Sequence, residues 1–295
     1  MNSAKSQLEL GILRTRERDR NHHLGGRSFY FFDFDDNIAH LATPLVIFDK
    51  KTNAERLLTS QEWALCHSQI GKPGPYANYY LDYDDRTGSF RYFRDQTQED
   101  LRKLGLKRQF FIDDLMKVLL LPDFQWKGPS WECFYHATFN QRPISVITAR
   151  GHGVDTLKAG IRILVDQKIL PMEPNYLSLF PVSRIDVRRQ LGDQDLVFSA
   201  AELKQRAIRA SVERAFEVFG YNPHHRFGMS DDDPKNIQLI YEEMKRLKRD
   251  YPEVSFFLIE THQGSFVKHE IYESGGQTFS GDSLVQMSLF DNSQS

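Results

Sequence analysis

Short, unbroken runs of apolar residues recur along this chain, and each predicts a buried strand. Continuous apolar runs are typical of parallel sheets, because helices cover both faces of such sheets. Three of the runs end abruptly in polar or acidic residues. The predicted strands are Phe29 to Phe32, Ile144 to Ile147, Tyr176 to Val182, the run that begins at Arg226, and Val254 to Ile259.

Segments with helical periodicity lie between the predicted strands. In these segments apolar residues recur at a spacing that places them on one face of an amphipathic helix. The predicted helices cover 98–121, 129–140, a stretch from Val154, 200–219, and a stretch from Pro234 that Pro252 closes. Alternating strands and helices predict an α/β fold with three layers and a mainly parallel sheet.

Composition narrows the class of protein. The chain has 295 residues, 40% of them hydrophobic, which is enough for one large core and a second, smaller module. A formal net charge of -2 provides no global basic field for nucleic acid. The two cysteines, Cys66 and Cys133, lack metal-binding spacing, and no apolar run is long enough to cross a bilayer. Because the N-terminus is too polar for a signal peptide, we expect a soluble, cytoplasmic protein without a membrane partner.

The stretch from Ser28 to Asn37 places carboxylates directly after the first predicted strand. In an extended chain, residues two apart point the same way, so Asp33 and Asp35 are expected to project together while Phe34 turns away. Two like charges this close favour a bound cation, and a hard divalent ion such as Mg²⁺ prefers oxygen ligands. The alternative is a solvated acidic turn after a buried strand.

The predicted strand 144–147 runs directly into Thr148, Ala149, Arg150 and Gly151. A hydroxyl at the end of a strand can donate to a phosphoryl oxygen together with nearby backbone N–H groups, so Thr148 is a candidate phosphate ligand. Arg150 is a candidate substrate-binding residue, through a bidentate contact with a phosphate. The alternative for Thr148 is an ordinary helix cap.

A further strand end carries Asp231, Asp232 and Asp233, and Pro234 then opens a helix. In α/β folds, ligands bind at the carboxyl ends of the strands, so Asp231 and Asp232 are candidate metal ligands. Asp233 is expected to cap the helix. The alternative is that the whole run is an acidic cap, which accounts well for one carboxylate but poorly for three.

Taken in order, the Asp-x-Asp, the Thr and the acidic run after three strands resemble motifs of the haloacid dehalogenase (HAD) superfamily. The resemblance covers roughly 28–51 and 129–264 and implies a Rossmann-like HAD core that uses Mg²⁺. It implies that Asp33 is the nucleophile that becomes an aspartyl phosphate, that Asp35 is the general acid and base, and that Thr148 binds the phosphoryl group. The metal ligands that it implies are Asp33, Asp35, Asp231 and Asp232.

The third HAD motif is a Lys or Arg on the helix before the acidic strand. Lys204, near the start of the predicted helix 200–219, has this place and is expected to neutralise the nucleophile and the phosphate. Lys235 is the competitor for this role and a candidate substrate-binding residue. The chain departs from the family here, because Lys235 and Asn236 stand where a further acid is often found.

The interval between Asp35 and Thr148 is long enough for an inserted cap domain, which HAD proteins place after the first motif. Residues 40–48 and 55–59 predict a hairpin, and the aromatic stretch 76–94 predicts a second hairpin around Gly88. The cap aromatics are expected either to form its own core or to stack on a substrate. The expected division is a basic flexible tail at 1–27, a HAD core at 28–54 and 128–270, an α+β cap at 55–127, and a flexible tail at 271–295.

The resemblance implies a Mg²⁺-dependent phosphate monoester hydrolase that acts on a small phosphorylated substrate. Two alternatives stay open. One is a non-catalytic binding or regulatory protein on a HAD core, which would bind metal without turnover. The other is a phosphatase of nucleic-acid ends that uses the arginine-rich N-terminal tail, and whose binding would depend strongly on salt.

Overall fold

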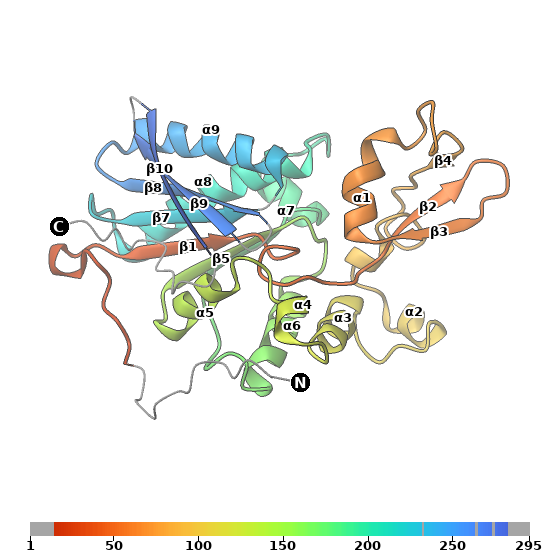
Figure 1. Ribbon diagram of the computed structural model, residues 1–295, viewed down its shortest axis with the longest axis horizontal. Coiled ribbons are helices and arrows are strands. Elements are labelled where there is room, and N and C mark those ends of the chain that lie inside the picture. Colours follow the sequence, from red (N-terminus) through yellow and green to blue (C-terminus); the bar gives the residue numbers. More distant parts are fainter. Residues whose placement is uncertain (1–14, 232, 263–264, 273–274, 283–295) are drawn as a thin grey trace.

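The central sheet of the protein has seven strands in the order β10-β9-β8-β7-β1-β5-β6 (Figure 1). A computed structural model describes residues 15–231, 233–262, 265–272 and 275–282. Neighbouring strands from β6 to β8 run parallel, and β9 and β10 add antiparallel strands at one edge. The strands are β1 (Ser28–Phe32), β5 (Pro143–Thr148), β6 (Asn175–Pro181), β7 (Arg226–Asp231), β8 (Ser255–His262), β9 (Ser265–Tyr272) and β10 (Gly275–Asp282).

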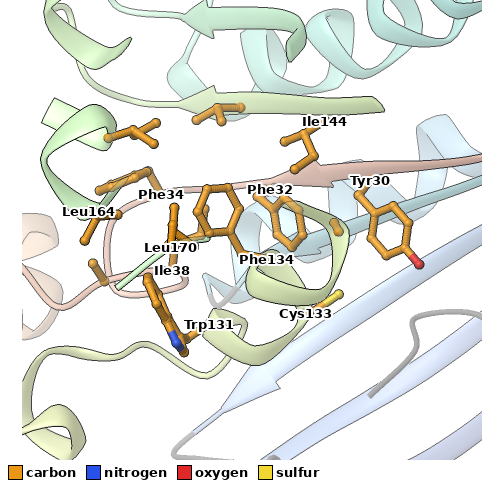
Figure 2. Packing of buried hydrophobic residues seen from close by; sticks show 14 of the residues in the cluster. Tyr30, Phe32, Phe34, Ile38, Trp131, Cys133, Phe134, Ile144, Leu164 and Leu170 are labelled. Atoms are coloured by element: carbon orange, nitrogen blue, oxygen red, sulfur yellow. The ribbon is translucent and has the colours of Figure 1, made fainter. Parts of the chain in front are cut away.

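Helices cover both faces of this sheet, because successive residues of the buried strands point to opposite sides. Tyr30 and Phe32 of β1 pack towards α5 (Trp131–Phe139) and α6 (Val154–Asp166), as Figure 2 shows for Phe134 and Leu164. Phe29 and Phe31 belong to the opposite core, with α7 (Ile185–Gln190), α8 (Ala200–Phe219) and α9 (Pro234–Asp250). The predicted three-layer α/β architecture with a mainly parallel sheet is therefore confirmed.

The segment between β1 and β5 builds a second, smaller sheet of three strands in the order β3-β2-β4. The predicted hairpin is present as β2 (Leu45–Asp49) and β3 (Glu55–Leu58), joined by a turn in which Asp49 Oδ1 accepts from the backbone N–H groups of Lys51 and Thr52. This sheet and the helix α1 (Ser60–Cys66) share a small core of Leu45, Ile47, Leu58 and Cys66. The 3-10 helix η2 (His67–Gln69) follows α1. Several of the aromatic residues of the segment pack against it, including Tyr76, Tyr79, Phe90 and Phe93.

The prediction of a second hairpin around Gly88 is wrong. β4 (Tyr79–Tyr80) pairs with β2 instead, and the chain after Gly88 forms the 3-10 helix η3 (Arg91–Phe93). The cause is the turn before it, where Asp84 Oδ1 accepts from the backbone N–H groups of Arg86 and Thr87 and closes the chain into a compact loop.

The single long helix predicted over 98–121 is also wrong. It is divided into α2 (Gln98–Lys103) and α3 (Phe110–Val118), and α4 (Asp123–Trp126) follows Pro122. Between α2 and α3, Gly105 has a φ of 67°, a left-handed conformation that ends α2 in the manner of a helix cap. The helical periodicity is thus real, but it belongs to separate short helices.

Both predicted flexible tails are structured where the structure describes them. After residues 1–14, which lie outside the described part, the segment before β1 is fixed to the core. Asp19 pairs with Arg142 at 2.7 Å, and the backbone N–H of Glu17 donates to Asn140 Oδ1 at 2.7 Å. Within this segment η1 (His22–Leu24) forms one short turn. At the other end β9 and β10 extend the sheet, so the predicted flexibility does not hold for 275–282, and 283–295 lie outside the described residues.

None of the helices in the described part of the chain is both long enough and apolar enough to cross a membrane.

Candidate active site at the carboxyl edge of the sheet

Three neighbouring strands bring the predicted site residues to one edge of the sheet. β1 lies between β5 and β7 and runs parallel to both, so the residues at or just after their carboxyl ends meet there. Thr148 and Asp231 end β5 and β7, and Asp33 directly follows β1. The backbone N–H of Asp33 still donates to Ser230 O at 3.1 Å, which carries the pairing with β7 one residue past the strand.

A buried lysine joins two of these carboxylates. Lys204 Nζ lies 3.0 Å from Asp33 Oδ2 and 2.9 Å from Asp231 Oδ2, and the lysine is only 2% exposed. Burial by itself lowers the pKa of Lys204, but the charges of Asp231 and Asp33 and their hydrogen bonds outweigh it, so its pKa is raised. The amine is therefore a permanent positive charge at this edge of the sheet.

The start of α8 sets the position of Lys204. Ser199 and Glu202 form a reciprocal capping box that fixes where the helix begins. The neighbouring Leu203 packs into the core, and Lys204, one position later, is directed to the ends of β1 and β7. Of the two lysines considered from the sequence, Lys204 is the one that the structure places beside Asp33. The side chain of Lys235 is not among the described ones.

Asp231 is held by several donors besides the lysine. Its Oδ1 accepts from the backbone N–H of Asp233 at 3.0 Å and from Asn236 Nδ2 at 3.0 Å. Asn236 thus uses its amide to fix the carboxylate, at the place where the family resemblance leads one to expect a further acid. Asp232, the other predicted ligand of this run, lies outside the described residues.

Asp35 has a different environment from Asp33. Its side chain is 28% exposed and accepts hydrogen bonds from Arg150. Arg150 Nη2 donates to Asp35 Oδ1 at 2.6 Å, and Arg150 Nε donates to Asp35 Oδ2 at 2.9 Å. Thr148 Oγ1 also donates to Asp35 Oδ2 at 3.3 Å. Although Asp33 and Asp35 leave the same strand end, one carboxylate therefore faces Lys204 and the other faces Arg150.

The position of Arg150 differs from the predicted phosphate contact. The residue is 0% exposed, and the carbon of its guanidinium lies 4.8 Å and 4.9 Å from the ring centroids of Phe93 and Phe111. The group is thus enclosed between two aromatic rings and bound to Asp35. In this arrangement Arg150 orients a carboxylate and does not face an open substrate site.

Asn37 is a residue of the site that the sequence analysis left without a role. It is buried, and its Nδ2 donates to Asp33 O, Ser230 O and Ser230 Oγ, at 3.2, 3.1 and 2.9 Å. Its Oδ1 accepts from the hydroxyls of Ser130 and Thr261. One amide therefore ties the loop after β1 to β7, β8 and the start of α5. An Asn four positions after an acid carries no sequence signal for such a role, because four of the five contacts are far away along the chain.

Asp33 and Asp231 are neighbouring carboxylates, and hard divalent ions prefer such oxygen ligands. In this structure the Oδ2 atoms of both converge on Lys204 Nζ, so the point that they share holds an ammonium group. Over 15–231, 233–262, 265–272 and 275–282 there is no group of three or more His, Cys, Asp or Glu at metal-binding distances. The described residues thus supply two neighbouring carboxylates, which Lys204 bridges.

A cleft of about 450 Å³ lies beside this edge of the sheet. It is bordered by Gly151 and Ser183, which follow β5 and β6, and by Arg94 from the inserted segment. Its charged lining is mixed, because three arginines alternate with three aspartates: Arg94, Arg184, Arg189, Asp85, Asp95 and Asp186. This volume is in the range of small-molecule sites.

Comparisons with protein-family models, with curated proteins and with solved structures found no match for this chain.

Proposed function

We propose that this protein is a Mg²⁺-dependent phosphate monoester hydrolase that works through an aspartyl phosphate, as in the HAD superfamily that its motifs resemble. The observation that supports this most is the buried Lys204, which lies between Asp33 and Asp231 at the carboxyl edge of the sheet. A fixed positive charge beside a carboxylate is the environment that an anionic nucleophile needs in order to approach an anionic phosphate.

In the first step Asp33 attacks phosphorus. A bond forms between its carboxylate oxygen and phosphorus, the bond from phosphorus to the ester oxygen breaks, and Asp35 gives its proton to the departing oxygen. In the second step Asp35 takes a proton from water, whose oxygen attacks the phosphoryl group and releases inorganic phosphate and free Asp33. Lys204 donates to the phosphoryl oxygens in both steps, and the Thr148 hydroxyl, which donates to Asp35 Oδ2 in this structure, turns to them when the substrate binds.

The resemblance to the HAD superfamily also implies a role for Mg²⁺. Asp33, Asp231 and the backbone carbonyl of Asp35 would hold the ion, with Asp232 as a further acid. When bound, Mg²⁺ supplies positive charge that offsets the repulsion between the carboxylates and the phosphate.

The alternative of a nucleic-acid-end phosphatase uses the arginine-rich N-terminal tail. Asp19 and the backbone of Glu17 hold the described part of that tail against the core, while Arg16, Arg18 and Arg20 stay exposed. A strong salt dependence of RNA or DNA binding would support this alternative, and its absence would count against it. Only a measurement of turnover distinguishes a non-catalytic binding protein from the proposed phosphatase.

The test measures release of inorganic phosphate from a generic aryl phosphate and a panel of phosphorylated metabolites, with Mg²⁺ or with EDTA. We expect turnover that requires Mg²⁺ and is abolished in Asp33→Asn. Asp36→Asn is the matched control, because Asp36 is next to the site in sequence but pairs with His40 at the surface. Turnover that survives in Asp33→Asn would exclude the proposed nucleophile, and metal binding without turnover of any compound would favour the binding-protein alternative.

A further inference from the structure

A chain of buried hydrogen bonds reaches Asp35 from the inserted segment. Arg150 Nη2, which donates to Asp35 at 2.6 Å, also donates to Thr43 Oγ1 at 2.8 Å. The hydroxyl of Thr43 in turn donates to Asp114 Oδ2, and the backbone N–H of Ala42 donates to Asp114 Oδ1 at 3.2 Å. The chain runs from α3, through the linker before β2, to the carboxylate that we propose as general acid and base.

Each hydrogen bond in this chain has a defined direction. Thr43 has one hydroxyl proton, and because it goes to Asp114, the lone pairs of the oxygen are left for Arg150. Asp114 accepts with both oxygens, from Ala42 and from Thr43. An asparagine in its place could accept with one oxygen only, so its amide group would face one of the two donors.

The side chains that form this series of hydrogen bonds are shielded from water. Arg150, Thr43 and Asp114 are all buried, so water is a poor substitute for a lost partner. Phe93 and Phe111, which flank the guanidinium, come from the same inserted segment as Asp114. The inserted segment therefore fixes the position of Arg150, whether or not it also contacts a substrate.

We propose that Asp114 and Thr43 are positioning residues, which hold Arg150 and through it the carboxylate of Asp35. This inference rests on the proposed function, because it assigns them to the acid and base of that reaction. When either is lost, Arg150 keeps its contacts with Asp35 and the two rings but loses the partner that fixes Nη2, so the pair can shift together and Asp35 is held less well towards the departing oxygen. Proton donation matters most for an alkoxide leaving group, which is a strong base, and least for a nitrophenolate, which leaves without help.

The test compares kcat for an alkyl phosphate and for p-nitrophenyl phosphate in Thr43→Val, Thr43→Ser and Asp114→Asn. General acid catalysis contributes roughly 100-fold or more, so we expect Thr43→Val and Asp114→Asn to lose at least about tenfold more kcat on the alkyl than on the aryl ester. KM should change little, and Thr43→Ser should restore the wild-type ratio because it keeps the hydroxyl. Equal losses on both esters, or no loss on either, would overturn the inference.

A second measurement does not depend on turnover. In the wild type the Nε–H of Arg150, bonded to both Asp35 oxygens, should give a slowly exchanging side-chain NMR signal, identified by its absence in Arg150→Lys. We expect faster exchange in Thr43→Val and Asp114→Asn but not in Thr43→Ser. Unchanged exchange would overturn the positioning role even if the wild type is an active phosphatase. Faster exchange in these two variants, together with a wild type that shows no turnover, would instead retain the hydrogen-bond chain and reject the proposed function.

Discussion

Lys204 Nζ lies 3.0 Å from Asp33 Oδ2, although the two residues belong to different elements far apart in the sequence. The lysine also contacts Asp231, so one buried cation balances two carboxylates. Removing one partner of a buried ion pair typically costs about 3–5 kcal/mol, because a buried charge is left without compensation. We expect Lys204→Met to lower the free energy of unfolding by about this amount and to abolish phosphate release.

Urea unfolding and the phosphate-release assay check this prediction. Combining Lys204→Met with Asp33→Asn should recover part of the stability, because the second change removes one of the uncompensated charges. Lys235→Ala should cost far less activity than Lys204→Ala. The reverse order would transfer the role of the third motif to Lys235.

Asn37 should be as important for stability as the charged residues. Asn37→Leu keeps the approximate size but removes all five hydrogen bonds, leaving buried hydroxyls and carbonyls of its partners without them. Each buried group left unsatisfied costs about 1–3 kcal/mol, so we expect a loss of at least about 3 kcal/mol in urea unfolding. Asn175→Leu is a control at the surface, where an amide bonds a single carbonyl of Gln141. Similar losses of stability in both variants would show that the five hydrogen bonds of Asn37 stabilise the protein no more than one surface hydrogen bond does.

His152 predicts a specific dependence of stability on pH. Burial, followed by the charges of Arg150 and Arg94, holds the pKa of His152 well below its ordinary value of 6.5. The folded state therefore keeps the ring neutral, while the unfolded chain takes up a proton once the pH falls below 6.5. Its contribution to stability is present above that pH and is lost as the pH falls through and below it.

The measurement is urea unfolding of the wild type and of His152→Phe from neutral to acidic pH. Phenylalanine keeps an aromatic ring next to Phe111 but cannot take up a proton. Below the ordinary pKa the wild type should lose up to about 1.4 kcal/mol per pH unit relative to the variant. Parallel stability curves for the two proteins would show that His152 is not kept neutral by the fold.

Gly160 should resist replacement although it lies inside a helix. A Cβ at this position would lie 2.3 Å from Cε1 of Phe111, the ring that flanks Arg150. Helix propensity alone predicts that Gly160→Ala stabilises the protein by up to about 1 kcal/mol. We expect instead a loss of about 1–3 kcal/mol from overpacking, measured by urea unfolding, together with reduced turnover.

The matched control is the neighbouring residue Ala159, which is exposed on the same helix. Ala159→Gly should cost about 1 kcal/mol through propensity alone and leave turnover unchanged. A stable and fully active Gly160→Ala protein would show that Phe111 moves without disturbing Arg150.

The sequence by itself determined the alternation of strands and helices and the edge of the sheet at which polar groups collect. These features depend on local patterns, since periodicity and capping act over a few neighbouring residues. The helix predicted at 200–219 is α8, which begins at a capping box and ends at Gly220, and both signals are local. Asp33, Thr148 and Asp231 could be brought together because parallel neighbouring strands end at the same edge.

Only the tertiary structure decided which partner each side chain takes. The sequence pattern predicts that Arg150 faces a phosphate, but Phe93, Phe111 and Asp35 enclose it, and these come from distant segments. Asp114 and Thr43 carry no motif, because their importance arises from a hydrogen-bond chain closed by folding. The same reason explains the N-terminal segment, which polar composition alone suggests is flexible and which Asp19 ties to the distant Arg142. The edge strand β10 falls within the predicted flexible tail, and it is structured because it pairs with the neighbouring strand β9.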